Sequence, residues 1–173
     1  MKHSPYFPQA ELLVRYLPAL AAANCFALKG GTAINLFVRD MPRLSVDIDL
    51  AYTPRERRDQ ALEQIREALD HVADRARRII PGLQVQYTGS RDAPKQVAWT
   101  STARIKIEPN PVLRGTVFES EQRRLVPAAE VVFERSATVA VVSVPDLYAG
   151  KLCAALDRGH PRDWFDLALL MRQ

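Results

Sequence analysis

The chain has 173 residues, of which 47% are hydrophobic and 25% are charged, as in globular proteins with a substantial core. We therefore expect a single domain over residues 1–173. The net charge of +4 permits an anionic partner such as RNA without requiring one. No apolar run has transmembrane length, the N-terminus lacks the layout of a signal peptide, and the two cysteines lie far apart. We expect no membrane association and a cytoplasmic location.

The first part of the chain combines helices with short strands. Apolar residues at helical spacing predict a helix from Pro8 to Ala23, and the apolar run from Cys25 to Leu28 predicts a buried strand. A glycine pair ends that strand, and a short helix is expected from Thr32 to Val38. A second strand is expected from Ser45 to Ala51, after a loop.

The rest of the chain predicts a long helix, several hairpins and a final helical pair. Thr53, Pro54 and Glu56 have the order of an N-cap, a first-turn proline and an N3 acid, which predicts where the long helix begins. The segments between Leu83 and Val142 alternate like hairpin strands, and residues 145–173 are expected to form two helices. Because the order lacks a strict βαβ rhythm, we predict an α+β fold with a mixed, mostly antiparallel sheet flanked by helices.

Two carboxylates, Asp47 and Asp49, stand two residues apart on the second predicted strand. Side chains alternate along a strand, so both point to one face. Crowded like charges need a compensating cation, and oxygen ligands at this spacing suit a hard ion such as Mg²⁺, with Mn²⁺ as an alternative. Glu108 ends a later alternating strand and is the candidate for a third ligand. It could instead be an exposed acid paired with Lys106 or an arginine.

Gly30, Gly31 and Thr32 lie where a strand gives way to a helix. The backbone N–H groups of such a turn favour an anion such as phosphate. The predicted metal site and phosphate site are therefore neighbours, and a nucleoside triphosphate (NTP) carries the ligands for both. Either short pattern alone is common, but the two together in a strand–turn–helix–strand context are specific.

A second group of charged residues lies near the C-terminus. Lys151 lies in an otherwise apolar predicted helix, so its charge is expected to face a cleft and an anion, and Asp163 opens the next helix. Lys151 could neutralise triphosphate charge while Asp163 orients it or a nucleophile; alternatively, Lys151 is a surface lysine and Asp163 stabilises the first turn of its helix. Arg43 could likewise offset phosphate charge or be a plain loop residue.

These segments together resemble a known family. Gly30-Gly31-Thr32 followed by Arg43-x-Ser45-x-Asp47-Ile-Asp49 is similar to the signature of the nucleotidyltransferase superfamily, which has the DNA polymerase β-like fold. Within it, the chain resembles the AbiEii/AbiGii toxin family, which includes the MenT toxins. The segments from Lys151 to Arg158 and from Pro161 to Leu167 resemble the later motif of that family, and the strand ending at Glu108 resembles its third-carboxylate strand. The resemblance spans residues 26–170.

The resemblance implies a Mg²⁺-dependent toxin that transfers a nucleotide from an NTP to the 3′ end of tRNA and is encoded beside an antitoxin. It assigns catalysis to Asp47, Asp49, Glu108, Lys151 and Asp163, nucleotide binding to Gly30, Gly31, Thr32, Arg43 and Lys151, and metal binding to Asp47, Asp49 and Glu108. Two alternatives stay open. One is a nucleotidyltransferase that modifies a protein, for example by adenylylation, and the other is a non-catalytic regulator that binds NTP or RNA.

Overall fold

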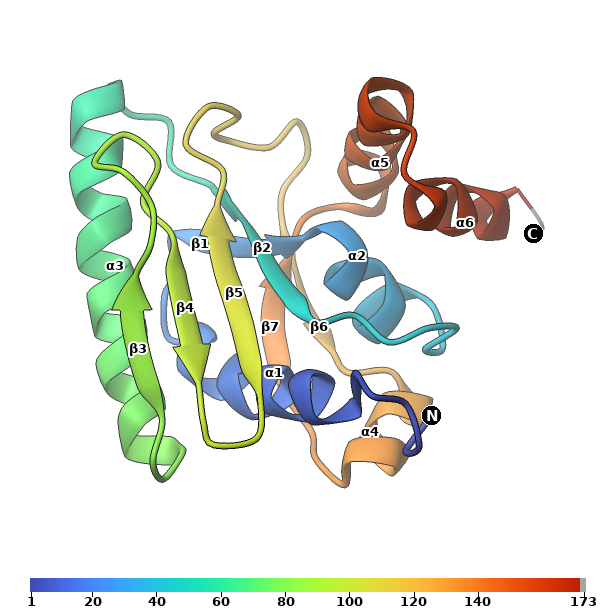
Figure 1. The fold of residues 1–173 in the computed structure, drawn as a ribbon. Coiled ribbons are helices and arrows are strands. Elements are labelled where there is room, and N and C mark those ends of the chain that lie inside the picture. Colours follow the sequence, from blue (N-terminus) through green and yellow to red (C-terminus); the bar gives the residue numbers. More distant parts are fainter. Residues whose placement is uncertain (172–173) are drawn as a thin grey trace.

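The computed structural model describes residues 1–171, within which seven strands form one sheet (Figure 1). The strands are β1 (Phe26–Lys29), β2 (Asp47–Tyr52), β3 (Gln84–Tyr87), β4 (Gln96–Trp99), β5 (Arg104–Pro109), β6 (Glu121–Arg124) and β7 (Thr138–Val141). Their order across the sheet is β3-β4-β5-β2-β1-β7-β6. The β2–β5 and β1–β7 pairs are parallel and the other neighbours are antiparallel. The predicted α+β fold with a mixed, mostly antiparallel sheet is confirmed.

The helices fall into two groups around this sheet (Figure 1). They are α1 (Phe7–Leu20), α2 (Gly30–Ala33) with the π-helical turn η1 (Ile34–Val38), α3 (Arg58–Ile79), α4 (Pro127–Phe133), α5 (Val144–Arg158) and α6 (Pro161–Leu170). Helix α1 packs against α3 and also contacts β5 and β7. Helices α5 and α6 contact each other, and α5 contacts α2. Within residues 1–171, no helix has both the length and the apolar character that a bilayer span requires.

The two faces of the central strands differ in chemistry. Ile48 and Leu50 on β2, with Ile105 and Ile107 on β5, are almost fully buried and belong to one hydrophobic core with α1 and α3. The residues between them are polar and are partly or fully exposed. Because side chains alternate along a strand, these polar residues all point to the opposite face, here called the open face.

The predicted start of the long helix at Thr53 is wrong, because α3 begins at Arg58. The Thr53 hydroxyl donates instead to the Cys25 carbonyl oxygen at 3.3 Å, and Glu56 accepts a hydrogen bond from the Tyr52 hydroxyl at 3.0 Å. These bonds extend the β1–β2 hairpin and leave a loop before the helix. The predicted C-terminal helical pair corresponds to α5 and α6, while residues 172–173 lie outside the described residues.

Candidate active site

The sheet register places the predicted carboxylates on one face of adjacent strands. Asp49 on β2 lies directly opposite Glu108 on β5 and opposite Lys29 on β1, and Asp47 lies opposite Lys106. Residues opposite each other on neighbouring strands point to the same face. Asp47, Asp49 and Glu108 therefore share the open face, as the alternation of their strands predicts.

Asp49 lies in a crowded and partly desolvated position. Burial raises the pKa of Asp49 above its ordinary value, Lys29 and Lys151 oppose that rise, and the negative charges of Glu108 and Asp47 add to it. The folded protein therefore holds a carboxylate whose ionised form is unfavourable by itself. A bound cation would remove this penalty.

Glu108 already has a partner in the structure. Its Oε1 lies 2.8 Å from the Nζ of Lys95, which extends from the loop before β4. Within residues 1–171, no group of three or more Asp, Glu, His or Cys side chains is placed to hold a metal ion. The role of Glu108 as a third ligand therefore stays a prediction. Asp47 and Asp49 alone still match the donor set of Mg²⁺ in NTP-binding sites, where one or two carboxylates act together with phosphate oxygens and water.

The glycine turn leaves no room for side chains. Gly30 has a φ of +70°, and a Cβ there would contact the Oδ2 of Asp49. A Cβ on Gly31 would lie 2.7 Å from the Nη2 of Arg43. Both glycines are therefore explained by the charged side chains that lie against them, and both of these side chains come from the segment from Arg43 to Asp49.

Thr32 is fully buried and its hydroxyl is used inside the protein. Its Oγ1 donates to the Asp47 carbonyl oxygen at 2.6 Å and lies 2.8 Å from the Ser45 hydroxyl oxygen. These contacts tie the glycine turn to the first residue of β2. Any contact of Thr32 with phosphate would therefore come from its backbone N–H, and the nucleotide-binding role assigned to it stays a prediction.

Lys151 and Asp163 are brought together as a buried ion pair. The Lys151 Nζ lies 2.8 Å from the Asp163 Oδ1, and the Arg158 guanidinium donates to both oxygens of Asp163 at 2.7 and 3.1 Å. The Arg158 hydrogen bond is the main cause that lowers the pKa of Asp163 to about 2, with Lys151 contributing. Asp163 thus stays ionised and positions the Lys151 ammonium group.

Asp166 is a further member of this network and is completely buried. It lies 3.0 Å from the Lys151 Nζ and accepts two hydrogen bonds from Arg43, at 2.9 and 2.6 Å. Burial raises the pKa of Asp166, but Arg43 and Lys151 outweigh it and hold the pKa below its usual range. Asn35 donates to the same carboxylate at 3.2 Å. The structure thus places Arg43 on Asp166, so a contact of Arg43 with phosphate stays a prediction.

A cavity of about 820 Å³ joins the two halves of the site. Asp49 lines it from β2, Gly30 from the start of α2, and Lys151 from α5. Four more cations line it as well: Lys29, Arg55, Arg114 and Arg158. The volume lies within the usual range for small-molecule sites, and a carboxylate below several cations suits a metal-bound polyphosphate.

Sequence reasoning missed several of these residues. Lys29 directly precedes the glycine pair and Asp166 follows Asp163 by one helical turn, so both had a local signal. Arg55 and Arg114 had no local signal, because they reach the cavity only where the loop after β5 folds over the end of β2. There the Gly115 N–H donates to the Tyr52 carbonyl oxygen at 2.7 Å, and Arg55 donates to the Thr116 carbonyl oxygen at 3.3 Å.

Comparison with solved structures identifies the class of fold. The chain is similar to MenT4, a nucleotidyltransferase toxin from Mycobacterium tuberculosis H37Rv, with a TM-score of 0.70 and 18% sequence identity. The match covers 95% of this chain and 58% of that chain, so this chain spans somewhat more than half of that toxin. The fold is therefore that of a nucleotidyltransferase toxin.

The family follows from the sequence itself. The family described as nucleotidyl transferase AbiEii toxin, type IV toxin–antitoxin system, matches residues 11–173. The chain belongs to this AbiEii family, which confirms the resemblance seen in the two motifs. No curated protein matches the chain.

Proposed function

We propose that this chain is a nucleotidyltransferase toxin that transfers a nucleoside monophosphate from an NTP to the 3′-hydroxyl of tRNA. One observation carries the proposal: Gly30 and Asp49 of the first motif line the same cavity as Lys151 of the second motif, which lies more than 100 residues further along the chain. Membership of the AbiEii family supports the same activity and suggests a cognate antitoxin. The free thiols of Cys25 and Cys153 agree with a cytoplasmic location.

The proposed reaction is an in-line displacement at the α-phosphorus. A bond forms between the RNA 3′-oxygen and the α-phosphorus, and the bond from that phosphorus to the bridging α–β oxygen breaks. Pyrophosphate leaves with the bonding electrons, and the hydroxyl proton passes to water. Mg²⁺ in this class of site supplies a lower pKa for the attacking hydroxyl and charge neutralisation at the leaving group.

The residues of the cavity divide this work between them. Asp47 and Asp49 would hold the metal together with phosphate oxygens, with Glu108 as the predicted third ligand. Lys29 and Lys151 both line the cavity and would bind the phosphates by charge. Asp163 would act through Lys151, because it fixes the position of the ammonium group without reaching the cavity lining.

The test is a transfer assay with each labelled NTP, Mg²⁺, total tRNA and a cell lysate. We expect label at the 3′ end of tRNA, and we expect Asp49→Asn to reduce transfer by at least roughly 100-fold, because it removes a metal ligand. Asp74→Asn is the matched control, since Asp74 lies on the surface of α3 and its one ion pair among residues 1–171 is with Arg77. Label in protein would instead identify a protein-modifying enzyme, and no label in either would support a non-catalytic regulator.

A further inference from the structure

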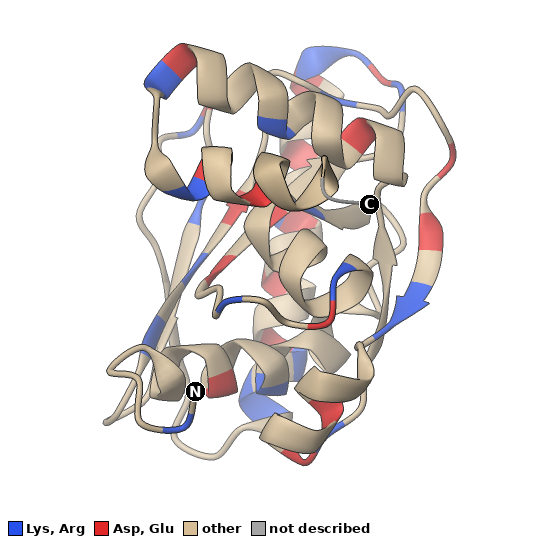
Figure 2. Ribbon diagram, turned by 90° about the vertical axis from the view of Figure 1, so that its right-hand side faces the viewer, with Lys and Arg blue, Asp and Glu red and all other residues tan. Residues whose placement is uncertain are grey.

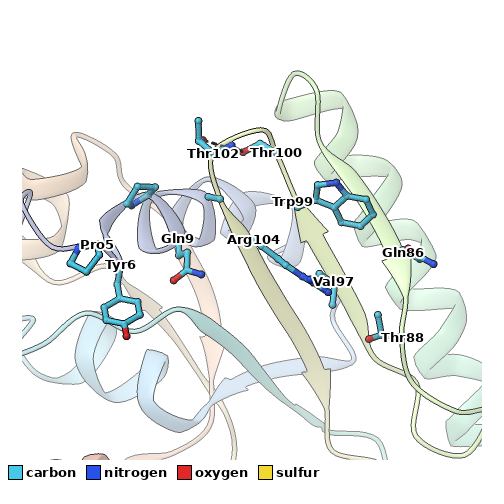
Figure 3. A pocket seen from close by; sticks show the side chains of 12 residues that line it. Pro5, Tyr6, Gln9, Gln86, Thr88, Val97, Trp99, Thr100, Thr102 and Arg104 are labelled. Atoms are coloured by element: carbon cyan, nitrogen blue, oxygen red, sulfur yellow. Dashed lines mark hydrogen bonds between the residues drawn. The ribbon is translucent and has the colours of Figure 1, made fainter.

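A second cavity, of about 660 Å³, opens where the start of α1 meets β3, β4 and β5. It shares no lining residue with the active-site cavity. Figure 3 shows Tyr6 and Gln9 on one side and Trp99 on the other, with the Arg104 side chain extending between them. The proposed reaction assigns no role to any of these residues.

The sheet register connects this cavity to the catalytic carboxylates. Trp99 lies opposite Arg104, and two residues further along β5 Lys106 lies opposite Asp47. Glu108 follows on the same face, about 13 Å from Arg104 at the usual rise of a strand. Trp99, Arg104 and Lys106 therefore form one continuous row on the open face, here called the β5 row, which leads to the metal-binding pair.

The two cations of the β5 row have no anionic partner among the described residues. Arg104 and Lys106 are exposed, and within residues 1–171 neither side chain forms an ion pair or a hydrogen bond. Other cations of the chain differ: Lys95 is paired with Glu108, and Arg77 on α3 is paired with Asp74. Unpaired cations in a row on a sheet are suited to an extended chain of phosphates.

The aromatic side chains offer free ring faces next to these cations. Tyr6 is 57% exposed and Trp99 is partly exposed, and in the described part of the chain neither ring stacks on another aromatic ring. Stacking on such rings accepts any nucleobase, because every base has a π-face. Aromatic rings next to unpaired cations favour a single-stranded nucleic acid over an acidic peptide, which has charge but no bases.

We propose that the cavity at Tyr6 and Trp99, together with the β5 row, binds the single-stranded 3′ end of the RNA acceptor. A base stacks on Trp99, Arg104 and Lys106 bind the phosphates that follow, and the terminal 3′-hydroxyl reaches Asp47 and Asp49. This inference rests on the proposed transfer to RNA, and it names the surface that presents the acceptor. Tyr6 closes the cavity on the side of α1.

Binding can be measured without catalysis, using a fluorescent eight-nucleotide single-stranded RNA and no NTP. We expect Trp99→Leu to weaken binding by roughly 5- to 100-fold, the effect of losing one stacked base, and Trp99→Phe to retain most of it. Trp164→Leu is the matched control, since Trp164 lies exposed on α6. The double change Arg104→Gln with Lys106→Gln should also reduce the salt dependence of the Kd for RNA. Because both residues are exposed, this variant tests the β5 row even if Trp99→Leu fails to fold.

Equal RNA affinity in the wild type, Trp99→Leu and the double variant would overturn the inference. So would tighter binding of an acidic peptide of the same length and charge than of the RNA. The transfer assay separates the two proposals. If Trp99→Leu keeps full transfer activity and an unchanged KM for RNA, RNA binding by the β5 row is wrong and the transferase proposal stands. If RNA binding depends on Trp99 but no nucleotide is transferred, RNA binding by the β5 row stands and the transferase proposal is wrong.

Discussion

At the scale of single residues, Gly30 has two separate reasons to be glycine. Its φ of +70° is unfavourable for any residue with a Cβ, and the Asp49 carboxylate occupies the space that a Cβ would need. Asp49 in turn lies among Lys29, Glu108 and Asp47. A side chain at Gly30 would therefore displace the carboxylate to which we assign metal binding.

We expect Gly30→Ala to lose transfer activity by roughly 100-fold, because it shifts a metal ligand, and to be less stable than Gly82→Ala. Gly82 is the matched control: its φ is +74° and nothing lies within 4 Å of its Cβ position. Both changes carry the backbone cost of about 1–2 kcal/mol, so the difference between their free energies of unfolding isolates the clash with Asp49. Equal stability and activity in the two variants would show that Asp49 tolerates the displacement. Urea unfolding and the labelled-NTP assay measure these quantities.

At the scale of elements, α5 and α6 are held by apolar contacts with the core on their inner side and by a buried network of charges. They lie side by side at one end of the molecule, and most of their ribbon is uncharged (Figure 2). The outward residues Leu152, Leu156 and Trp164 are about half exposed or more. On the inner side Leu147 and Tyr148 join the hydrophobic core, Asp163 pairs with Lys151 and Arg158 between the two helices, and Asp166 pairs with Arg43 of the loop before β2.

The Asp163 contacts make part of the stability dependent on pH. The pKa of Asp163 falls from 3.8 to about 2 on folding, so its contribution is present above pH 4 and is lost as the pH falls toward 2. The shift corresponds to about 2 kcal/mol before salt screening at the exposed Arg158. We expect Asp163→Asn to unfold more easily at pH 7 and to lose less stability between pH 4 and pH 2 than the wild type does.

Urea unfolding at a series of pH values measures this effect. Asp157→Asn serves as the control, because Asp157 is exposed on the last turn of α5 and, within residues 1–171, forms no ion pair with Lys151 or Arg158. It should keep the full acid dependence of the wild type. If Asp163→Asn keeps it as well, other carboxylates are responsible for the acid sensitivity.

At the scale of the whole molecule, the sheet places Asp49 beside Asp47 and Glu108, which lowers the stability of the protein until a cation binds. Because burial and neighbouring acids raise the pKa of Asp49, stability without metal falls as the pH rises from the ordinary carboxyl range through the raised value. The cations around the cavity cannot remove this cost alone, since Lys151 is shared with Asp163 and Asp166. Binding of Mg²⁺ with an NTP should therefore stabilise the protein.

We expect Mg²⁺ with a non-hydrolysable NTP analogue to raise the Tm by roughly 5–10 °C at a hundredfold excess over Kd. Asp49→Asn should be at least as stable as the wild type without ligand, because it removes the crowded charge, and should lose the ligand-dependent rise. Differential scanning fluorimetry measures both. A destabilised Asp49→Asn protein that still responds fully to the ligand would mean that Asp49 is structural and that the metal binds elsewhere.

Local patterns in the sequence were sufficient for much of this fold. The alternation in β2 and β5 predicted which side chains share a face, and the glycine pair predicted where β1 ends. The cap signature at Thr53 failed because hydrogen bonds from the neighbouring strand and from Tyr52 use the same side chains. A local signal decides the structure only where no tertiary partner competes for the same polar groups.

The sequence by itself determined the family, the carboxylate pair and the two motifs, because those depend on short spacings along the chain. Only the tertiary structure decided what these motifs touch. It showed that Lys151 meets Asp49 across one cavity, that Arg43 is held by Asp166, and that Glu108 already pairs with Lys95. The Arg43–Asp166 contact joins residues 123 positions apart, and no spacing along the chain records how the folded sheet and helices bring them together.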